Sequence, residues 1–417
     1  MKKFALISCV LLTFIIGVYF YYYSDNEKYV LENSKSKQII NSNSLTLMYE
    51  TEEDSGEYQV SSDNTWPQEG YAFNETLSKC ENGSSLTWNS ESNRVILEAN
   101  TSDRCYVYFD VVLPPILVEY ITTEAYTGND GDNGLYYHDG IGSYTNANLE
   151  AGDNSYRYAG ENPNNFVCFG SDAGICSEDN LYRIIGVFDG EVKLIKADYA
   201  TASLLGTDGD YSGIVSELGR PTDYYKGSID RSLIGVYYWN NSTSANTWSE
   251  SKLNTVNLNQ NYINNIGSKW SNLIATTSWQ VGGMLYNNLN SVKDYYMVEL
   301  GSNSSSTTYS TKIGLMYVSD YGYAASPDNW NTDLFVYNND TNRNNNWMYM
   351  GLSEWAITHP SDSSSFVFSV YGDGKVGTDF AFGSYSLGSS ARPSFYLNAD
   401  VQYISGTGTQ TDPYRIA

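Results

Sequence analysis

Aromatic and amide side chains crowd together in the last quarter of the chain. An aromatic face can stack on a sugar ring or on a protein partner, and an Asn amide donates and accepts hydrogen bonds at once. Rigid aromatic side chains also bind at low entropic cost. Core packing is the alternative for Trp347 and Trp355, and turn formation is the alternative for the Asn residues. The candidate ligand-binding residues are Tyr337, Asn344, Asn345, Asn346, Tyr349, Tyr371 and Tyr385.

Oxygen-bearing side chains in a glycine-rich loop suggest a second kind of chemistry, the binding of calcium. Ca²⁺ takes several oxygen ligands, and this loop offers them at alternate positions. The full calcium-loop motif with a closing Glu is absent, so a solvated turn is the competing interpretation. Asp208-Gly209-Asp210 is a second, weaker candidate. The candidate calcium ligands are Asn129, Asp130, Asp132 and Asp139, and no other cofactor is expected.

Motifs for catalysis are missing or fail on context. The sequence contains neither G-x-S-x-G nor H-E-x-x-H, and its two histidines, His138 and His359, lie far apart. Gly372–Gly377 matches the dinucleotide pattern G-x-G-x-x-G, but a strand-like stretch follows where a helix should begin. Paired carboxylates could hydrolyse glycosides, yet 48 acidic residues offer too many pairs to select one. We therefore expect a protein that is not an enzyme.

Four cysteines remain once Cys9, inside an apolar run, is set aside. An even number in an exported chain suggests disulfides, and three pairings are possible. Local pairing is the simplest, with each bond contributing about 2–4 kcal/mol. A thiol metal site is disfavoured because no C-x-x-C occurs and no His is close in sequence. The four candidate disulfide cysteines are Cys80, Cys105, Cys168 and Cys176.

The first residues predict export. Lys2 and Lys3 precede Phe4–Tyr23, which carries no charge and is long enough to cross a bilayer. The paired lysines favour the cytoplasmic side, which leaves the C-terminus outside. A cleaved signal peptide is the alternative, but no small-residue cleavage site precedes Ser24. We expect a single-pass protein of the cell membrane with an extracellular C-terminus.

The net charge restricts the partners. At −25 the chain would repel a phosphate polyanion, so nucleic acid is excluded as an expected partner. Apart from the membrane around the N-terminal helix, the expected partner is a glycan or protein ligand at the cell surface.

Most of the elements that would position these residues are expected to be strands. Alternating strands predict a small all-β domain over 45–112, after a transmembrane anchor at 1–23 and a stalk at 24–44. Residues 113–165 are expected to form a Gly/Asn/Asp-rich linker. In the domain at 166–417, Asp189-Gly190 predicts a hairpin turn, and helical spacing begins at Trp248 and stops at Gly267. Strands combined with this helix predict an α+β fold.

Several short motifs in the C-terminal part occur in one order: the hairpin around Asp189-Gly190, Thr247–Leu253 leading to Leu258–Tyr262, the strand Ile313–Ser319 and the ending Ala391–Asn398. This order resembles an uncharacterised bacterial domain that is associated with the C-type-lectin-like fold, which formylglycine-generating-type enzymes also use. The resemblance covers about 240 residues, roughly 165–404. It implies a mixed α/β core with the ligand face at about 338–390. Formylglycine-type catalysis is not implied, because no thiol follows Cys176.

The first 110 residues are similar to anchored surface proteins of low-GC Gram-positive and mollicute-like bacteria. The leading hypothesis is a membrane-anchored surface protein that binds a glycan or a protein through aromatic and Asn-rich loops. The alternatives are a structural envelope protein without a specific ligand and, less favoured, a glycan-acting hydrolase.

Overall fold

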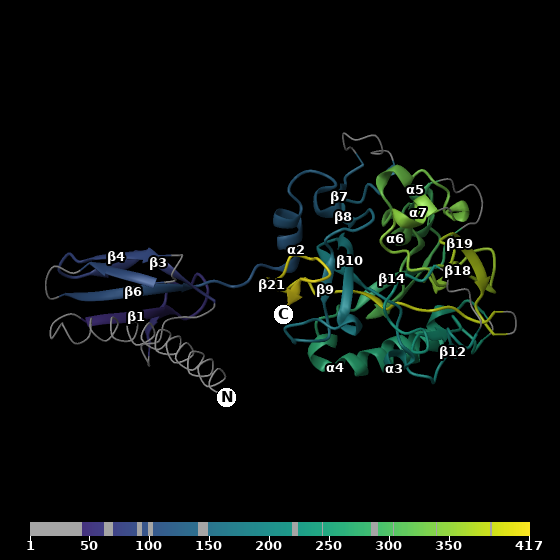
Figure 1. Ribbon diagram of the computed structural model, residues 1–417, viewed down its shortest axis with the longest axis horizontal. Coiled ribbons are helices and arrows are strands. Elements are labelled where there is room, and N and C mark those ends of the chain that lie inside the picture. Colours follow the sequence, from purple (N-terminus) through teal and green to yellow (C-terminus); the bar gives the residue numbers. More distant parts are fainter. Residues whose placement is uncertain are drawn as a thin grey trace, which may run out of the picture. The chain divides into compact units, whose positions relative to one another are not determined.

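A computed structural model gives two compact units, which meet in the sequence after Pro114 (Figure 1). We call them the N-terminal unit and the C-terminal unit. The structure describes residues 44–61, 70–89, 94–98, 103–140, 149–218, 224–243, 245–284, 291–302, 304–338, 340–383 and 386–417. The expected anchor at 1–23 and nearly all of the expected stalk lie outside these residues.

The N-terminal unit is built from strands in the order β2-β1-β6-β3, with a separate β4–β5 hairpin. β1 pairs with β6 in parallel, whereas the other pairs are antiparallel. Alternate side chains point inward, so Leu47, Val107 and Phe109 are buried. The rings of Phe73 and Trp88 stack on each other and pack against this core. The strands are β1 (Ser44–Glu50), β2 (Tyr58–Val60), β3 (Tyr71–Cys80), β4 (Ser85–Asn89), β5 (Arg94–Glu98) and β6 (Arg104–Val111).

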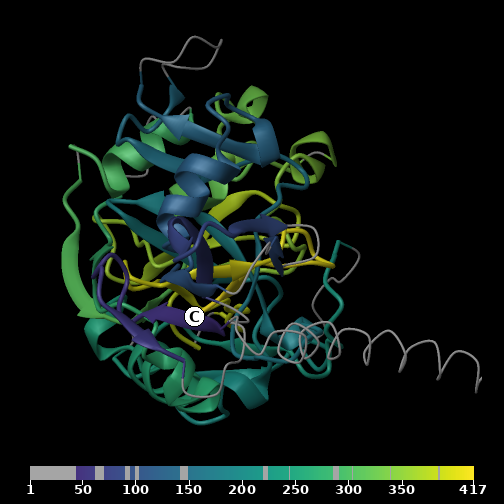
Figure 2. The ribbon, with the colours of Figure 1, turned by 90° about the vertical axis from the view of Figure 1, so that its left-hand side faces the viewer.

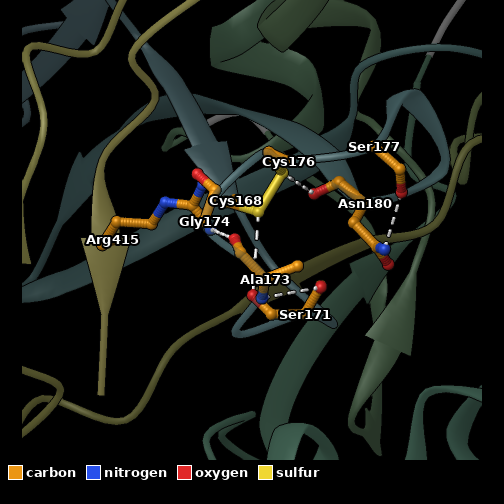
Figure 3. The surroundings of a disulfide bond; sticks show 8 residues. All are labelled: Cys168, Ser171, Ala173, Gly174, Cys176, Ser177, Asn180 and Arg415. Carbon is orange, nitrogen blue, oxygen red and sulfur yellow. Dashed lines mark hydrogen bonds between the residues drawn. A yellow bond between two sulfur atoms is a disulfide. The ribbon is translucent and has the colours of Figure 1, made fainter. Parts of the chain in front are cut away.

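Both disulfides have the local pairing. Cys80 and Cys105 occupy directly paired positions of β3 and β6 and are bonded to each other. Cys168 and Cys176 form the second disulfide, which closes a short loop. Arg415 donates hydrogen bonds of 2.8 and 2.7 Å to the carbonyls of Ala173 and Gly174 in this loop (Figure 3). The prediction that all four cysteines form disulfides is therefore confirmed.

The C-terminal unit is organised around a sheet in the order β16-β20-β11-β10-β8-β7, with β9 paired to β10. Nearly every residue of β10 and β11 is buried, as expected for strands that are covered on both faces. Figures 1 and 2 show α3 and α4 on one side of this unit and α5, α6 and α7 on the opposite side. The strands of this sheet are β7 (Leu135–His138), β8 (Ser155–Tyr158), β9 (Phe166–Cys168), β10 (Leu181–Phe188), β11 (Glu191–Lys196), β16 (Ile313–Gly314) and β20 (Ser394–Tyr396).

Smaller sheets and short helices complete the C-terminal unit. The remaining strands are β12 (Tyr211–Ile214) with β13 (Gly235–Tyr237), β14 (Thr277–Val281) with β15 (Thr307–Thr311), β17 (Glu354–Trp355) with β18 (Phe366–Val370) and β19 (Val376–Phe380), and β21 (Tyr403–Ser405) with β22 (Arg415–Ile416). The α-helices are α2 (Leu117–Tyr120), α3 (Ala202–Leu205), α4 (Ile263–Ser271), α5 (Val292–Glu299), α6 (Val318–Tyr323) and α7 (Asp340–Asn344). The 3₁₀ and π-helical turns are Ile121–Ala125, Asp132–Gly134, Glu178–Asn180, Trp248–Glu250, Leu253–Tyr262, Pro327–Asn329 and Leu334–Val336.

The predicted fold class, an α+β C-type-lectin-like domain behind a small all-β domain and a transmembrane helix, is wrong. The described chain is mostly sheet, and its helices are few and short. Within the part of the chain that the structure describes, no helix is long and apolar enough to span a bilayer. Where we expected helical spacing from Trp248 to Gly267, Leu253–Tyr262 forms wide π-helical turns, and α4 continues past Gly267 to Ser271. Asn257 stabilises these turns, because its side-chain amide donates to the carbonyl of Leu205 and accepts from the backbone N–H of Asp210.

Residues that we assigned to a linker lie inside the C-terminal unit. β7 and β8 come from the segment 113–165, and β8 pairs with β10 of the central sheet. Gly134 precedes β7 with a φ of 78°, in a space where an added Cβ would meet Pro163. The glycines that suggested a linker thus include one that a close approach of two chain segments requires.

The β10–β11 hairpin carries a testable backbone constraint. Asp189 and Gly190 have φ angles of 50° and 82° at its turn, as the sequence predicted. A Cβ at Gly190 would meet no atom within 4 Å, so Gly190→Ala isolates the cost of the left-handed conformation. We expect it to lower the free energy of unfolding by about 1 kcal/mol in urea denaturation. Gly174→Ala is the matched control, because Gly174 has equal space and no left-handed φ; equal effects of the two substitutions would refute this explanation.

Candidate functional site

One pocket of the C-terminal unit collects several of the predicted ligand-binding residues. It has a volume of about 340 Å³ and is lined by side chains that lie far apart in the sequence. We call it the Arg183 pocket. The lining residues that matter here are Phe166, Arg183, Lys226, Asn344, Trp347 and Tyr349.

Arg183 is the most constrained side chain of this pocket. It leaves β10 beside its cross-strand partner Phe166 on β9, and only 8% of its surface is exposed. Its guanidinium lies over the Phe166 ring at 4.3 Å and over the Trp347 ring at 4.5 Å. Nε donates to Asn165 Oδ1 at 2.7 Å, and the terminal nitrogens donate to the carbonyls of Trp347 and Pro163 at 3.4 and 3.3 Å. Two aromatic faces and these hydrogen bonds therefore hold the cation in one orientation.

No carboxylate of the described residues forms an ion pair with Arg183. All three of its hydrogen-bond acceptors are neutral. Burial, together with the neighbouring positive charge of Arg392, lowers the pKa of the Arg183 guanidinium to about 9.

A second cation stands at the pocket surface. Lys226 is exposed, its Nζ donates to Asn344 Oδ1 at 3.2 Å, and it lies 5.0 Å from the centre of the Tyr349 ring. Asp198 also lines the pocket, but its carboxylate accepts from Tyr225 Oη and from three backbone N–H groups, including that of Ser228. Glu161 and Glu178 are exposed at the rim. The pocket thus combines one buried cation with a polar rim of both signs.

The structure brings some of the predicted ligand-binding residues to this pocket and leaves others elsewhere. Asn344, Asn346 and Tyr349 line it, whereas Tyr337, Asn345 and Tyr371 do not. Tyr385 lies outside the described residues.

Most of the aromatic residues in this set serve the fold. Tyr337 is fully buried and donates from its hydroxyl to the Asn342 carbonyl at 2.7 Å. The hydroxyls of Tyr349 and Tyr371 donate to the carbonyls of Gly372 and Thr378 at 2.7 and 2.6 Å.

The amides of this set divide in the same way. The side-chain amide of the buried Asn346 donates to the carbonyl of Tyr321 and accepts from the backbone N–H of Met348. Asn345 is half-buried, and its carbonyl accepts from the backbone of Ser326. Of these three predicted amides, Asn344 is the one that is exposed to solvent in the pocket.

Three residues that line the pocket and set its charge and shape were not among the predicted site residues: Arg183, Phe166 and Lys226. Arg183 interrupts the apolar run of β10, and a charge within a buried strand is a signal that could have been used. Phe166 and Lys226 carry no such signal, because their role depends on contacts with segments far along the chain.

The calcium candidates form a turn that is held by its own hydrogen bonds. Asp130 accepts from the Tyr137 backbone at 2.7 Å and from the Tyr126 hydroxyl at 3.2 Å, while Asp132 accepts from the Thr127 hydroxyl. Across the described residues, the one group with the spacing of metal ligands is Cys80, Asp103 and Cys105. Its two sulfurs form a disulfide, so they are not available as thiolate ligands.

The second calcium candidate is also occupied by protein groups. Asp210 is buried and accepts from the backbones of Lys252 and Leu253 at 2.8 and 3.1 Å. Asp208 accepts from Asn261 Nδ2 at 2.6 Å. Of the G-x-G-x-x-G stretch, residues 372–375 lie in the turn between β18 and β19, and Val376 and Gly377 begin β19.

A second pocket bears on the hydrolase alternative. It has a volume of about 270 Å³, and Asp153, Glu191 and Asp320 are among its lining residues. Asp153 pairs with Arg157 and Asp320 pairs with Lys193, both at 2.6 Å. A general acid needs a proton at working pH, and a carboxylate held in an ion pair does not keep one. Burial next to Asp189 raises the pKa of Glu191, which suits this side chain to the general-acid role better than Asp153 or Asp320, whose carboxylates lie in ion pairs.

His138 predicts a pH dependence of stability. It is fully buried against Tyr323 and Trp330, and its Nδ1 accepts from the Ala151 backbone at 3.1 Å. Burial lowers the pKa of the imidazole well below its usual value, so the unfolded chain binds a proton at a higher pH than the folded chain does.

We therefore expect His138 to contribute a loss of stability of up to about 1.4 kcal/mol per pH unit as the pH falls below about 6.5. The measurement is urea denaturation of wild type and His138→Asn between pH 7 and 5, since Asn keeps an acceptor at the Nδ1 position. The variant should show the shallower decline of the two. Parallel curves would contradict this interpretation.

Comparison of the chain with protein-family models, with curated proteins and with solved structures finds no match.

Proposed function

We propose that this chain is a cell-surface binding protein that takes up a glycan or protein ligand at the Arg183 pocket. In this proposal Phe4–Tyr23 holds the chain in the membrane and the remainder faces outward. The observation that carries the proposal is the convergence of Asn344, Lys226 and the clamped Arg183 in one pocket. A buried cation is expensive to maintain without a counter-charge, and a ligand could supply one.

Two further features support export. Disulfides persist in oxidising compartments and are rare in the cytosol, and this chain has two of them, one in each unit. The uncharged run after Lys2 and Lys3 has the length of a membrane span and the charge asymmetry of an N-terminal anchor.

A structural envelope protein is the second candidate function. It is favoured by the burial of Tyr337, Trp347 and Tyr349, which leaves little of these rings for a ligand to contact. On this alternative the Arg183 pocket would be a packing feature of the fold.

The test is capture of ligands by the full-length protein in mild detergent, on a glycan array and in a pull-down from surface extracts. Lys226→Gln and Asn344→Ala alter exposed pocket side chains, so they should leave the fold intact. The proposal expects both variants to lose a ligand that wild type captures. Lys269→Gln is the control, because Lys269 is an exposed cation outside the pocket. Failure to capture any ligand, or capture that ignores both pocket variants, would favour the structural alternative.

A further inference from the structure

Buried cations of the C-terminal unit usually lie against a carboxylate. Lys193, Arg157 and Arg392 are each at most 1% exposed, and each has a carboxylate oxygen at 2.6 or 2.7 Å. Arg183 departs from this pattern, since its acceptors are one amide oxygen and two backbone carbonyls.

Lys196 is a second exception, because its buried Nζ has no hydrogen-bond partner among the described residues. It does not line the Arg183 pocket. Of these two buried cations without a paired carboxylate, Arg183 is the one that lines the pocket and that a ligand can reach.

The free donors of Arg183 suit a planar anion. The hydrogen bond from Nε to Asn165 is short, at 2.7 Å. The two hydrogen bonds from the terminal nitrogens are longer, at 3.3 and 3.4 Å, and both end on backbone carbonyls. A guanidinium has five N–H donors in a fixed plane, so donors remain for two parallel bonds to a carboxylate. The Phe166 and Trp347 rings fix that plane in advance, which lowers the entropic cost of binding.

We infer that the ligand of the Arg183 pocket carries a carboxylate and that it is an acidic sugar residue, such as a uronic or sialic-type acid. The inference rests on the proposed function and names the ligand class of the same site. The carboxylate lies against the terminal nitrogens of Arg183, and Lys226 adds a second positive charge at the surface.

The rest of the pocket favours a sugar over an acidic peptide. A volume of about 340 Å³ is at the small end for ligand sites and suits one or two sugar rings. Asn344, Ser228 and Gln410 offer hydroxyl partners at the rim, and exposed Glu161 and Glu178 accept hydroxyl protons. A peptide with several acidic residues would instead be repelled by those two carboxylates and by the net charge of −25.

The test compares ligands that differ in the carboxylate alone. The full-length protein in detergent is titrated with D-galacturonic acid and with N-acetylneuraminic acid, each beside its methyl ester, and with D-galactose. We expect at least one free acid to bind about tenfold or more tightly than its ester, because a charge-assisted bidentate contact is lost in the ester. Equal affinity of acid and ester, or no binding of either acid, would overturn the inference.

Variants then assign the effect to the pocket. Arg183→Gln should abolish the difference between acid and ester. Because Arg183 is buried, its fold is checked by circular dichroism, and the exposed Lys226→Gln provides a second variant that should weaken acid binding several-fold. Lys269→Gln should bind as wild type does.

The two proposals can fail separately. If the array captures neutral glycans or proteins through the pocket, and neither acid binds more tightly than its ester, the acidic-sugar inference fails and the binding function stands. Tighter binding of a short Asp- or Glu-terminated peptide than of either acid would likewise replace the sugar with a peptide ligand. If nothing is captured at all, the binding function fails with it.

Discussion

Replacing Asp320 by asparagine will lower the free energy of unfolding of the C-terminal unit by about 3–5 kcal/mol. Asp320 Oδ2 lies 2.6 Å from Lys193 Nζ, and both side chains are 1% exposed. Asparagine keeps an oxygen for the Tyr317 backbone N–H, which Asp320 accepts at the start of α6. It removes the counter-charge of an ammonium that burial already disfavours, as the lowered pKa of Lys193 indicates.

The chain contains a matched control for this change. Lys269 and Asp172 form an ion pair at the same 2.6 Å distance, but their side chains are 59% and 65% exposed. Exposed pairs of this kind contribute about 0–1 kcal/mol, so Asp172→Asn should have little effect in urea denaturation. Similar losses for the two variants would show that burial does not set the strength of these pairs.

Removing the Cys80–Cys105 disulfide will unfold much of the N-terminal unit. The bond closes a separation of 25 residues, for which unfolded-state entropy predicts a contribution of about 3–4 kcal/mol. Among the described residues of this unit, the core cluster has three buried apolar members, Leu47, Val107 and Phe109, so little else compensates. We expect Cys80→Ser/Cys105→Ser to expose the amides of β1 and β6 in hydrogen exchange.

The second disulfide gives the comparison. Cys168 and Cys176 are only 8 residues apart and sit on a unit with a far larger core, so their removal should cost about 2–3 kcal/mol without global unfolding. Retention of full amide protection in the N-terminal unit of the Cys80→Ser/Cys105→Ser variant would show that strand packing alone holds it together.

Local patterns predicted the local features of the fold. The Asp189-Gly190 turn was predictable because two residues with positive φ are a short-range requirement of the hairpin. The disulfide pairing followed from proximity along the chain.

The fold class failed for the opposite reason. Asn257 supports wide π-helical turns through contacts with Leu205 and Asp210, which are about 50 positions away in the sequence. β7 and β8 were hidden because their strands are short and lie among glycines that we interpreted as a linker.

The site was predictable only in part. Asn344 and Tyr349 stood out by residue type, and both line the Arg183 pocket. The clamp around the guanidinium joins Phe166 of β9 with Trp347, and no pattern within one segment reveals such a contact. Burial also reverses the expected role of Tyr337, whose hydroxyl serves the backbone of its own loop.

The most direct test of the account asks whether the folded chain faces the outside of the cell with its cysteines oxidised. Intact cells are treated with a membrane-impermeant maleimide, with and without prior treatment by an impermeant reductant, and the mass of the protein is measured. The account predicts that Cys80, Cys105, Cys168 and Cys176 are labelled only after reduction and without lysis of the cells. Four thiols that stay unlabelled in intact cells, and that react without any reductant once the cells are lysed, would contradict it.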